Sequence, residues 1–256
     1  MPTIQDVARA AGVSISTVSY VLSGTRPISD ATRERIFRAM EEIGYRPNAL
    51  AQGLASRRSR IIALLMGPGD RDVGSTEMEF VNGAAQAARE AGYHLVLWAD
   101  PLEGPADLTE LGGRGLVDGV LLMEVSLHDW RVETLTRLDM PCALIGRPAD
   151  AAGLTWVDID FDRTVAGALD WLESAGHHNL LLVNQSRSSH EAGYGPAVRI
   201  LDSFRQECSR RNLAGEALFC ERDAPTGREL VRNDLAERTE TTTIVTMNDQ
   251  ALPGII

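Results

Sequence analysis

The sequence predicts a protein in two parts, a small bundle of three short helices followed by a larger α/β region with parallel sheets. Three observations lead to this fold class. Residues 3–44 hold three amphipathic segments at helical spacing, each beginning at a polar residue that suits a helix N-cap. From residue 60, short aliphatic runs alternate with amphipathic segments, as in parallel strands joined by helices. A length of 256 residues, 44% of them hydrophobic, leaves room for one small and one larger domain.

The first two helices are short and are joined by a tight turn. Thr3 can cap the first helix, with Asp6 completing a capping box, and Ser14 can cap the second. Gly12 supplies the permissive backbone of the turn between them. The apolar stripes are Val7, Ala8 and Ala11 in the first helix and Val18, Val21 and Leu22 in the second. Such a pair is a helix-turn-helix, whose second helix suits the major groove of DNA.

A third helix is predicted to support this pair. Ser29 is expected to cap it and Gly44 to end it. Its apolar stripe consists of Ile36, Ala39, Met40 and Ile43. Taken alone, three short capped helices are equally compatible with a helical bundle of unrelated purpose.

Two further motifs make the DNA-binding interpretation specific. They are Gly44-Tyr45-Arg46-Pro47-Asn48 and Ala51-Gln52-Gly53-Leu54-Ala55. Together with the opening helix-turn-helix, they make the chain similar to the LacI/GalR family of bacterial transcription regulators, and the resemblance continues through the rest of the chain. The resemblance implies a homodimer that binds a pseudo-palindromic operator on double-stranded DNA, acting as a repressor under the control of a small-molecule effector. It also implies an effector domain like that of periplasmic binding proteins.

The resemblance divides the chain into three parts. We expect a helix-turn-helix DNA-binding domain at residues 1–46 and a hinge helix with its linker at residues 47–59. An effector-binding and dimerisation domain should occupy residues 60–256.

Base reading is expected from the start of the second helix. In the family pattern, the matching positions are Ile15, Ser16 and Tyr20. Ile15 can pack against a thymine methyl group, whereas Tyr20 stands where relatives often carry Arg or His, so a relative's half-site does not transfer. Phosphate contacts, which position the protein without specifying a sequence, are expected from Thr3, Ser14, Thr17, Ser19 and Asn48. Thr17 and Ser19 are equally compatible with ordinary helix surface.

The hinge segment at residues 48–56 has helical composition, but a helix of roughly two turns is not stable alone in water. We expect it to fold on DNA. The resemblance implies that paired hinge helices enter the minor groove, where Leu54 matches a leucine wedge. Ala51 matches the position where the hinge helices touch, and Ala55 closes the same motif. The alternative is an ordinary linker with a chance leucine.

The remaining sequence predicts two doubly wound parallel-sheet lobes. Strands are expected in the first at 61–66, 94–99, 119–123 and 142–145, with helices near 76–91, 106–114 and 128–138. In the second, helices are expected at 161–175, 196–212 and 226–237, with strands at 179–184, 216–220 and 243–246. The sequence stops at Ile256, just inside a further helix, so we expect an incomplete second lobe and an apparent truncation at the C-terminus.

Ligands of open α/β sheets bind beyond the carboxyl ends of the strands. Met247-Asn248-Asp249-Gln250 matches the family's ligand-facing turn, and Arg199 stands beside the position, Ile200, where relatives place an effector-binding arginine. The expected effector is a sugar or a nucleoside, although each site residue alone fits an exposed loop equally well. The expected effector-binding residues are Asp70, Glu124, Arg147, Arg199, Asn248 and Asp249.

Charge and composition exclude several other functions. The chain has a net charge of −11, but residues 1–60 contain nine arginines and five acidic residues, a local charge of +4 where phosphates would be met. The chain contains no lysine, which excludes Walker A, Schiff-base and protein-kinase chemistry. No Gly-x-Ser-x-Gly elbow occurs, and His177-His178 has no partners at metal spacing. We therefore expect no enzyme activity, no catalytic residues, no cofactor and no metal.

The remaining expectations concern the environment and the alternatives. Cys142, Cys208 and Cys220 are scattered and are interpreted as reduced packing residues. With no secretory leader and no apolar run of membrane-spanning length, the expected location is the cytoplasm, without a membrane partner. Two alternatives remain open: a small-molecule binding protein or enzyme of doubly wound fold, and an effector-blind, truncated DNA-binding remnant.

Overall fold

The structure is a computed structural model, and it describes residues 2–24, 26–46, 58–67, 74–98, 102–113 and 115–256. The chain divides into two compact units, which we describe separately. The first consists of Met1–Ile61 with Glu110–Asp118, and the second of Ile62–Thr109 with Gly119–Ile256.

The first unit contains the three predicted helices: α1 (Ile4–Ala10), α2 (Ile15–Ser23) and α3 (Asp30–Glu42). The capping box of α1 is formed as expected, because the Thr3 backbone N–H donates to Asp6 at 2.9 Å and the Asp6 N–H donates to the Thr3 hydroxyl at 3.4 Å. Gly12 has a φ of +62°, the left-handed conformation that the turn between α1 and α2 requires.

The core of the helical unit uses the predicted stripes. Val7, Val18 and Ile36 are fully buried, one from each helix. The half-buried side chains of Val21, Leu22 and Ile43 pack against them. Ser29 occupies the N-cap position of α3, but its hydroxyl donates to Thr32 Oγ1 at 2.9 Å and makes no capping bond to the backbone.

The second unit begins with a five-stranded sheet in the order β2-β1-β3-β4-β5. The pairs β1/β3, β3/β4 and β4/β5 are parallel, with Ala63 opposite Val120 and Leu121 opposite Ala143. The strands are β1 (Ile61–Leu65), β2 (His94–Trp98), β3 (Gly119–Leu122), β4 (Cys142–Ile145) and β5 (Trp156–Val157).

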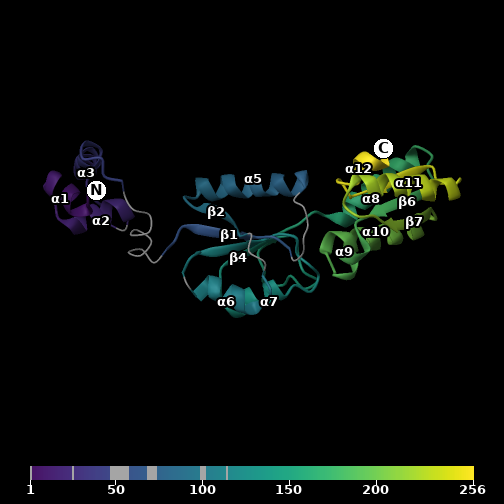
Figure 1. Cartoon of the computed structure of the whole chain (residues 1–256), viewed down its shortest axis with the longest axis horizontal. Coiled ribbons are helices and arrows are strands. Elements are labelled where there is room, and N and C mark those ends of the chain that lie inside the picture. Colours follow the sequence, from purple (N-terminus) through teal and green to yellow (C-terminus); the bar gives the residue numbers. More distant parts are fainter. Residues whose placement is uncertain (1, 25, 47–57, 68–73, 99–101, 114) are drawn as a thin grey trace. The chain divides into compact units, whose positions relative to one another are not determined.

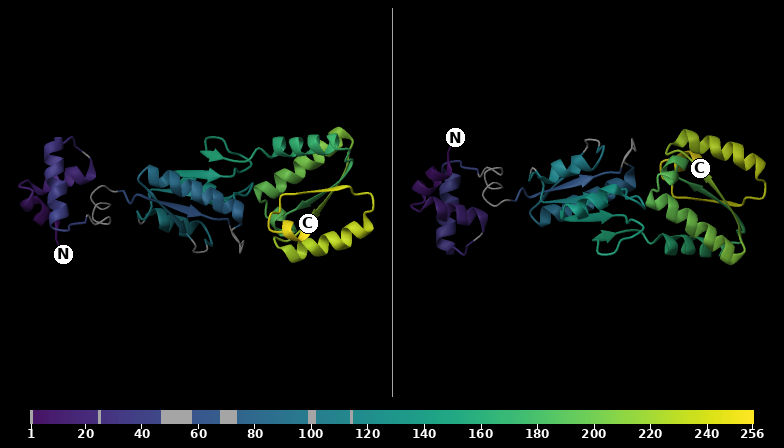
Figure 2. Two further views of the ribbon diagram at one scale, coloured as in Figure 1. Left: turned by 90° about the horizontal axis from the view of Figure 1, so that it is seen from above. Right: turned by 90° about the horizontal axis from the view of Figure 1, so that it is seen from below.

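Helices cover both faces of this sheet, as a parallel sheet requires. Helix α5 (Ser75–Glu90) lies on one face, and α6 (Pro105–Gly113) and α7 (Trp130–Arg137) lie on the other (Figure 1). Figure 2 shows α5 lying over the strands when the unit is seen from above. Leu64 of β1, Leu122 of β3 and Leu135 of α7 are fully buried, each at most 1% exposed.

The second sheet has three parallel strands in the order β7-β6-β8. They are β6 (Asn179–Asn184), β7 (Ala214–Phe219) and β8 (Thr243–Thr246), and the helices around them are α8 (Phe161–Ser174), α9 (Arg187–Glu191), α10 (Gly195–Arg211), α11 (Ala224–Glu237) and α12 (Leu252–Ile255). Alternate residues of β6 face opposite sides. Leu180 and Leu182 pack with α8 and α10, whereas Leu181 and Val183 pack with α11 and α12.

The predicted lobes are therefore present, with local differences. Two short elements were not predicted. Strand β5 has two residues, too few to show an alternating pattern, and the five residues of α9 span little more than one turn. Helix α7 starts at Trp130, two residues later than expected, because the Asp129 side chain caps its first turn. Strand β7 starts at Ala214, two residues earlier than expected. No helix among the described residues is long and apolar enough to cross a bilayer.

Candidate functional site

The leading turn of α2 presents the predicted base-reading residues. Ser14 caps the helix through a hydrogen bond from the Thr17 backbone N–H at 3.1 Å. Its hydroxyl also lies 2.8 Å from Ser16 Oγ and 2.7 Å from Thr17 Oγ1. Ile15 leaves 46% of its surface exposed although it is aliphatic, and Ser16 is exposed beside it. The first turn of α2 therefore offers one apolar and several hydroxyl groups to a partner.

Tyr20 lies one turn further along α2 and has a cationic neighbour. The guanidinium of Arg26 lies 4.8 Å from the centre of the Tyr20 ring, a cation–π contact. Sequence reasoning overlooked Arg26, because the loop after α2 has no periodic pattern that would bring it back to the helix. The contact places a planar hydrogen-bond donor next to a residue expected to read bases.

Several predicted site residues lie outside the described residues. They are Asn48, Ala51, Leu54 and Ala55 of the hinge segment and Asp70 of the expected effector site.

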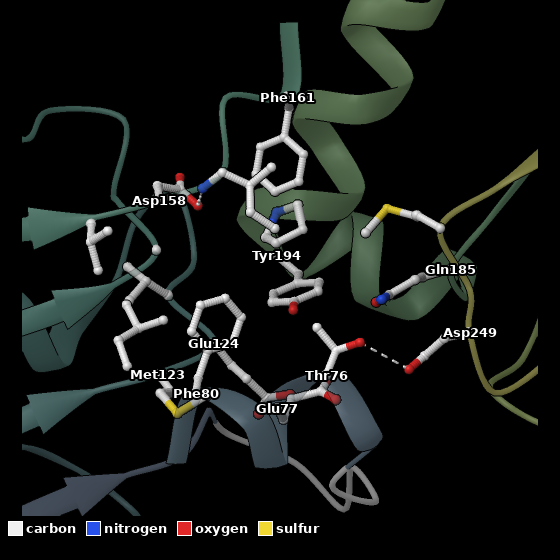
Figure 3. Close-up of a pocket in the computed structure, with 17 residues that line it drawn as sticks. Thr76, Glu77, Phe80, Met123, Glu124, Asp158, Phe161, Gln185, Tyr194 and Asp249 are labelled. Carbon is white, nitrogen blue, oxygen red and sulfur yellow. Dashed lines mark hydrogen bonds between the residues drawn. The ribbon is translucent and has the colours of Figure 1, made fainter. Parts of the chain in front are cut away.

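The second unit encloses a cavity of about 190 Å³ at the carboxyl ends of its strands (Figure 3). Its polar lining comes from Thr76, Glu77, Glu124, Asp158, Gln185, Tyr194 and Asp249. Its apolar lining comes from Phe80, Met123, Val125, Ile145, Val157, Ile159, Phe161, Pro196 and Met247, together with Gly146. Both sheets contribute to the lining, as the rule for open α/β folds predicts.

Glu124 and Glu77 share one arginine at the edge of this cavity. Arg222 donates to Glu77 Oε1 at 2.8 Å, and its Nη1 lies 3.7 Å from Glu124 Oε1. Glu124 also accepts a hydrogen bond from the Gly67 backbone N–H at 3.1 Å, which ties it to the end of β1. Glu124, a predicted effector residue, therefore lines the cavity in a paired and 8% exposed state.

A buried arginine supports the backbone beneath Glu124. Arg131 forms an ion pair with Asp129, with Nη2 2.7 Å from Oδ2. The same nitrogen donates to the carbonyl oxygens of Met123 and Glu124, each at 3.2 Å. Glu124 has a φ of +53°, a left-handed conformation that is costly outside glycine. Because its carbonyl is held by Arg131, this conformation is kept at the cavity wall.

Arg147 and Arg199 lie behind the cavity wall and contact its carboxylate Asp158. Arg147 Nε and Arg199 Nη1 each lie 3.5 Å from Asp158 Oδ2. Arg199 also donates to the carbonyl oxygen of Arg147 at 2.7 Å, which fixes its direction. Burial raises the pKa of the Asp158 carboxyl, and the two arginines only partly oppose that shift. Neither arginine is among the residues that line the cavity.

Asn248 and Asp249 are neighbours with different surroundings. Asn248 is fully buried, and its side-chain amide donates to the carbonyls of Cys220 and Glu221 at 3.0 and 3.1 Å. It therefore fixes the loop after β8. Asp249 lines the cavity and accepts a hydrogen bond from the Thr76 hydroxyl at 3.4 Å.

Three further lining residues, Thr76, Glu77 and Asp158, were not singled out from the sequence. Thr76 and Glu77 occupy the first turn of α5, the helix that follows β1 in the chain. Asp158 directly follows β5, the strand whose shortness hid it. The rule that ligands bind beyond strand ends applies to all three, but it needs the helix and strand boundaries. No group of three or more His, Cys, Asp or Glu side chains among the described residues is arranged to hold a metal ion.

The fold and these two sites define a class of protein: a helix-turn-helix unit joined to an α/β unit with a cavity at its strand ends. Residues 3–48 match the model of the family described as bacterial regulatory proteins, lacI family. This match places residues 3–48 in that family of bacterial regulatory proteins.

Comparisons with individual proteins agree with that assignment. The chain is 32% identical over 221 residues to the HTH-type transcriptional regulator pepR1 of Lactobacillus delbrueckii subsp. lactis, covering 85% of this chain and 64% of that protein. It likewise spans less than two thirds of the length of other curated relatives that it matches.

Two solved structures share the fold. One is the complex of the transcriptional regulator CelR with cellobiose, with a TM-score of 0.62 at 25% identity, covering all of this chain and 78% of that one. The other is the lac repressor dimer bound to operator and an anti-inducer, with a TM-score of 0.76 at 21% identity, covering 99% of this chain and 76% of that one.

Proposed function

We propose that this protein is a DNA-binding transcriptional regulator, acting as a repressor, whose affinity for DNA is set by a small polar ligand in the cavity. The observation that carries the proposal is the leading turn of α2, where a capped helix exposes Ile15 and Ser16. A helix presented in this way fits the major groove, where side chains near its start reach base edges.

The distribution of charge along the chain also supports DNA binding by the helical unit. Residues 1–60 carry a net charge of +4 and the rest of the chain −15. Phosphates therefore attract the helical unit and repel the remainder, and operator affinity should fall steeply as salt concentration rises. Thr3, Ser14, Thr17, Ser19 and Asn48 remain the proposed phosphate contacts. A protein that acts on chromosomal DNA in this way works in the cytoplasm, which is the location we propose.

The proposed complex is a homodimer on a pseudo-palindromic operator. Two amphipathic elements of the second unit support self-association, because α5 exposes Met78 and the edge strand β2 exposes Val96 and Leu97. The hinge residues Ala51, Leu54 and Ala55 belong to this proposal as the minor-groove wedge between the two subunits.

Ligand control is proposed to act through the cavity between the two sheets of the second unit. Its walls include α5, the loop after β3, the loop after β6 and the loop after β8. A ligand that contacts all four shifts the population toward whichever arrangement it binds more tightly, and the shift is limited by that difference in affinity. The expected ligand is a small polar molecule of the sugar or nucleoside type.

The test is selection of binding sites from a randomised DNA duplex library, followed by affinity measurements on the selected duplex. We expect an inverted repeat to be enriched. Tyr20→Ala should weaken binding to that repeat by about tenfold, because one base-reading contact is worth about 1–3 kcal/mol. The matched control is Phe37→Ala, which removes an aromatic ring that is 47% exposed on α3 and should leave the affinity unchanged. Failure to enrich any sequence, or an equal loss on a scrambled duplex, would falsify base reading by α2.

A further inference from the structure

We propose that the ligand of the cavity carries a protonated amino group, bound where Glu77, Gln185 and Asp249 converge. The inference deepens the proposed function, on which it rests, because it assigns a chemical class to the ligand of that site. The three side chains come from α5 and from the loops after β6 and β8. Figure 3 shows them around one end of the cavity, with Thr76 beside them.

The lining of the cavity is rich in hydrogen-bond acceptors. Four of its 17 residues are carboxylates, and none is arginine, lysine or histidine. Carboxylates accept hydrogen bonds and donate none at neutral pH, so the ligand has to supply the donors. An anionic ligand, such as a sugar phosphate, would bring a further negative charge to a lining whose only cations are the arginines already paired with its carboxylates.

The neutralising arginines are distributed unevenly among these carboxylates. Arg222 lies against Glu77 and Glu124, and Arg147 and Arg199 both lie against Asp158. Asp249 has a hydroxyl partner, Thr76, and no ion pair within the parts of the chain that the structure describes. Since a half-buried carboxylate is stabilised by an opposite charge, Asp249 is the group that a ligand cation would complete.

Two acceptor oxygens at the same end of the cavity have unmet hydrogen-bonding capacity, beside the Nε and Nη1 donors of Arg222. Glu77 Oε2 and Gln185 Oε1 are buried without a hydrogen-bond partner among the described residues. Gln185 is only 4% exposed, and its amide points into the cavity (Figure 3). A buried acceptor without a donor costs about 1–3 kcal/mol. An ammonium group has three donors and no acceptor, which matches Glu77, Gln185 and Asp249.

The rest of the cavity fits the body of such a ligand. The rings of Phe80, Phe161 and Tyr194 line it. Aromatic faces attract a nearby cation and also pack against the apolar face of a sugar or another ring. The site is therefore suited to an amine whose carbon skeleton is of sugar or single-ring size.

The experiment is isothermal titration calorimetry of the whole chain with matched probes. The pairs are glucosamine against glucose and 2-phenylethylamine against 2-phenylethanol, with glucose 6-phosphate as the anionic probe. We expect at least one amine to bind about tenfold more tightly than its neutral partner, because one charge-assisted hydrogen bond is worth about that factor. Equal or tighter binding of the neutral partner or of the phosphate overturns the proposal, and so does the absence of binding by both amines.

A pair of variants locates the amine. Asp249→Asn keeps the shape of the side chain and removes its charge, so the preference for the amine should fall to about twofold or less. The control Asp202→Asn changes an exposed aspartate of α10 that does not line the cavity, and it should leave the preference intact. Survival of the preference in Asp249→Asn overturns the assignment of this site.

Operator binding measured without any ligand separates the two proposals. Specific DNA binding without amine preference rejects only the ligand class. Amine binding without specific DNA binding rejects the regulatory function and leaves the ligand class standing.

Discussion

Arg131 is the most deeply buried charged side chain among the described residues, with 1% of its surface exposed. Its guanidinium contacts both oxygens of Asp129, at 2.9 and 2.7 Å, and also binds carbonyl oxygens after β1 and β3. A buried ion pair contributes little compared with a well-packed apolar pair, but losing one partner leaves an uncompensated charge. Arg131 therefore stabilises the fold mainly by neutralising the buried carboxylate of Asp129.

Arg131→Met should lower the free energy of unfolding by about 3–5 kcal/mol, because the Asp129 carboxylate stays buried without its partner. Urea denaturation followed by circular dichroism measures the change. The double variant Asp129→Asn with Arg131→Met should recover part of that loss, because the asparagine keeps the cap of α7 and carries no charge. A double variant no more stable than Arg131→Met alone would show that the lost arginine contacts, rather than the orphaned charge, account for the cost.

The sequence predicts least well which individual residues line the cavity. Asn248 and Asp249 both follow a strand, and both were expected to contact ligand. In the structure, Asn248 turns inward to bond the carbonyls of Cys220 and Glu221, while Asp249 lines the cavity. Neighbouring loop residues can point in opposite directions, and only the path of the backbone decides which one meets the cavity. Arg147 and Arg199, also expected to contact ligand, contact Asp158 and are not among the lining residues.

At the level of elements, α8 and α10 are held together by charge as well as by their apolar stripes. Arg211 of α10 pairs with Asp170 and Glu173 of α8 and with Glu207 of its own helix. Hydrogen bonds from Arg210 and Arg211 lower the pKa of Glu207 to about 2, well below its ordinary value of 4.5. The carboxylate therefore favours the folded state only while it is ionised.

This shift predicts a pH-dependent effect of Glu207→Gln on thermal stability. Because the pKa of Glu207 is lower in the folded state, its ionised carboxylate stabilises the fold fully above the unfolded value of 4.5. This contribution to stability is lost as pH falls from 4.5 to about 2. Glu207→Gln should therefore lower the melting temperature at pH 7, and the difference from the unmodified chain should shrink progressively below pH 4.5. Calorimetric melts across this range measure it, with Glu191→Gln, an exposed change on α9, as the control. A difference that stays constant with pH contradicts the role of the ionised carboxylate.

Elements with strong periodicity were predictable, and short ones were not. The long helices and the aliphatic strands appear within two residues of their expected bounds, because α8 has its apolar stripe and β6 its run of buried aliphatics. Strand β5 depends on pairing with β4, through Leu144 opposite Trp156, and its local sequence pattern does not predict a strand. Helix α9 depends on its cap Ser186 and on contact with α10. Tertiary contacts therefore create both elements that the sequence analysis overlooked.

At the level of the whole molecule, the proposed regulator needs two subunits, because one α2 reads only one half of a repeated site. Strand β2 lies at the edge of its sheet, and its exposed residues include Val96 and Leu97, at 39% and 51% exposure. An apolar strand left at a sheet edge promotes pairing with another chain unless something covers it. Helix α5, which contacts β2, also exposes the apolar Met78.

Leu97→Glu should therefore convert the proposed dimer into a monomer, because each copy would bring a carboxylate into an apolar contact. Analytical ultracentrifugation measures the state, and the affinity for the selected inverted repeat should fall by about 100-fold as the second half-site is lost. The matched control is Trp171→Glu, which places the same charge on α8 at a side chain that is 68% exposed and should leave the dimer intact. A dimer that persists in Leu97→Glu excludes β2 as its contact, and a monomer that still binds the repeat tightly excludes the two-subunit mode of reading.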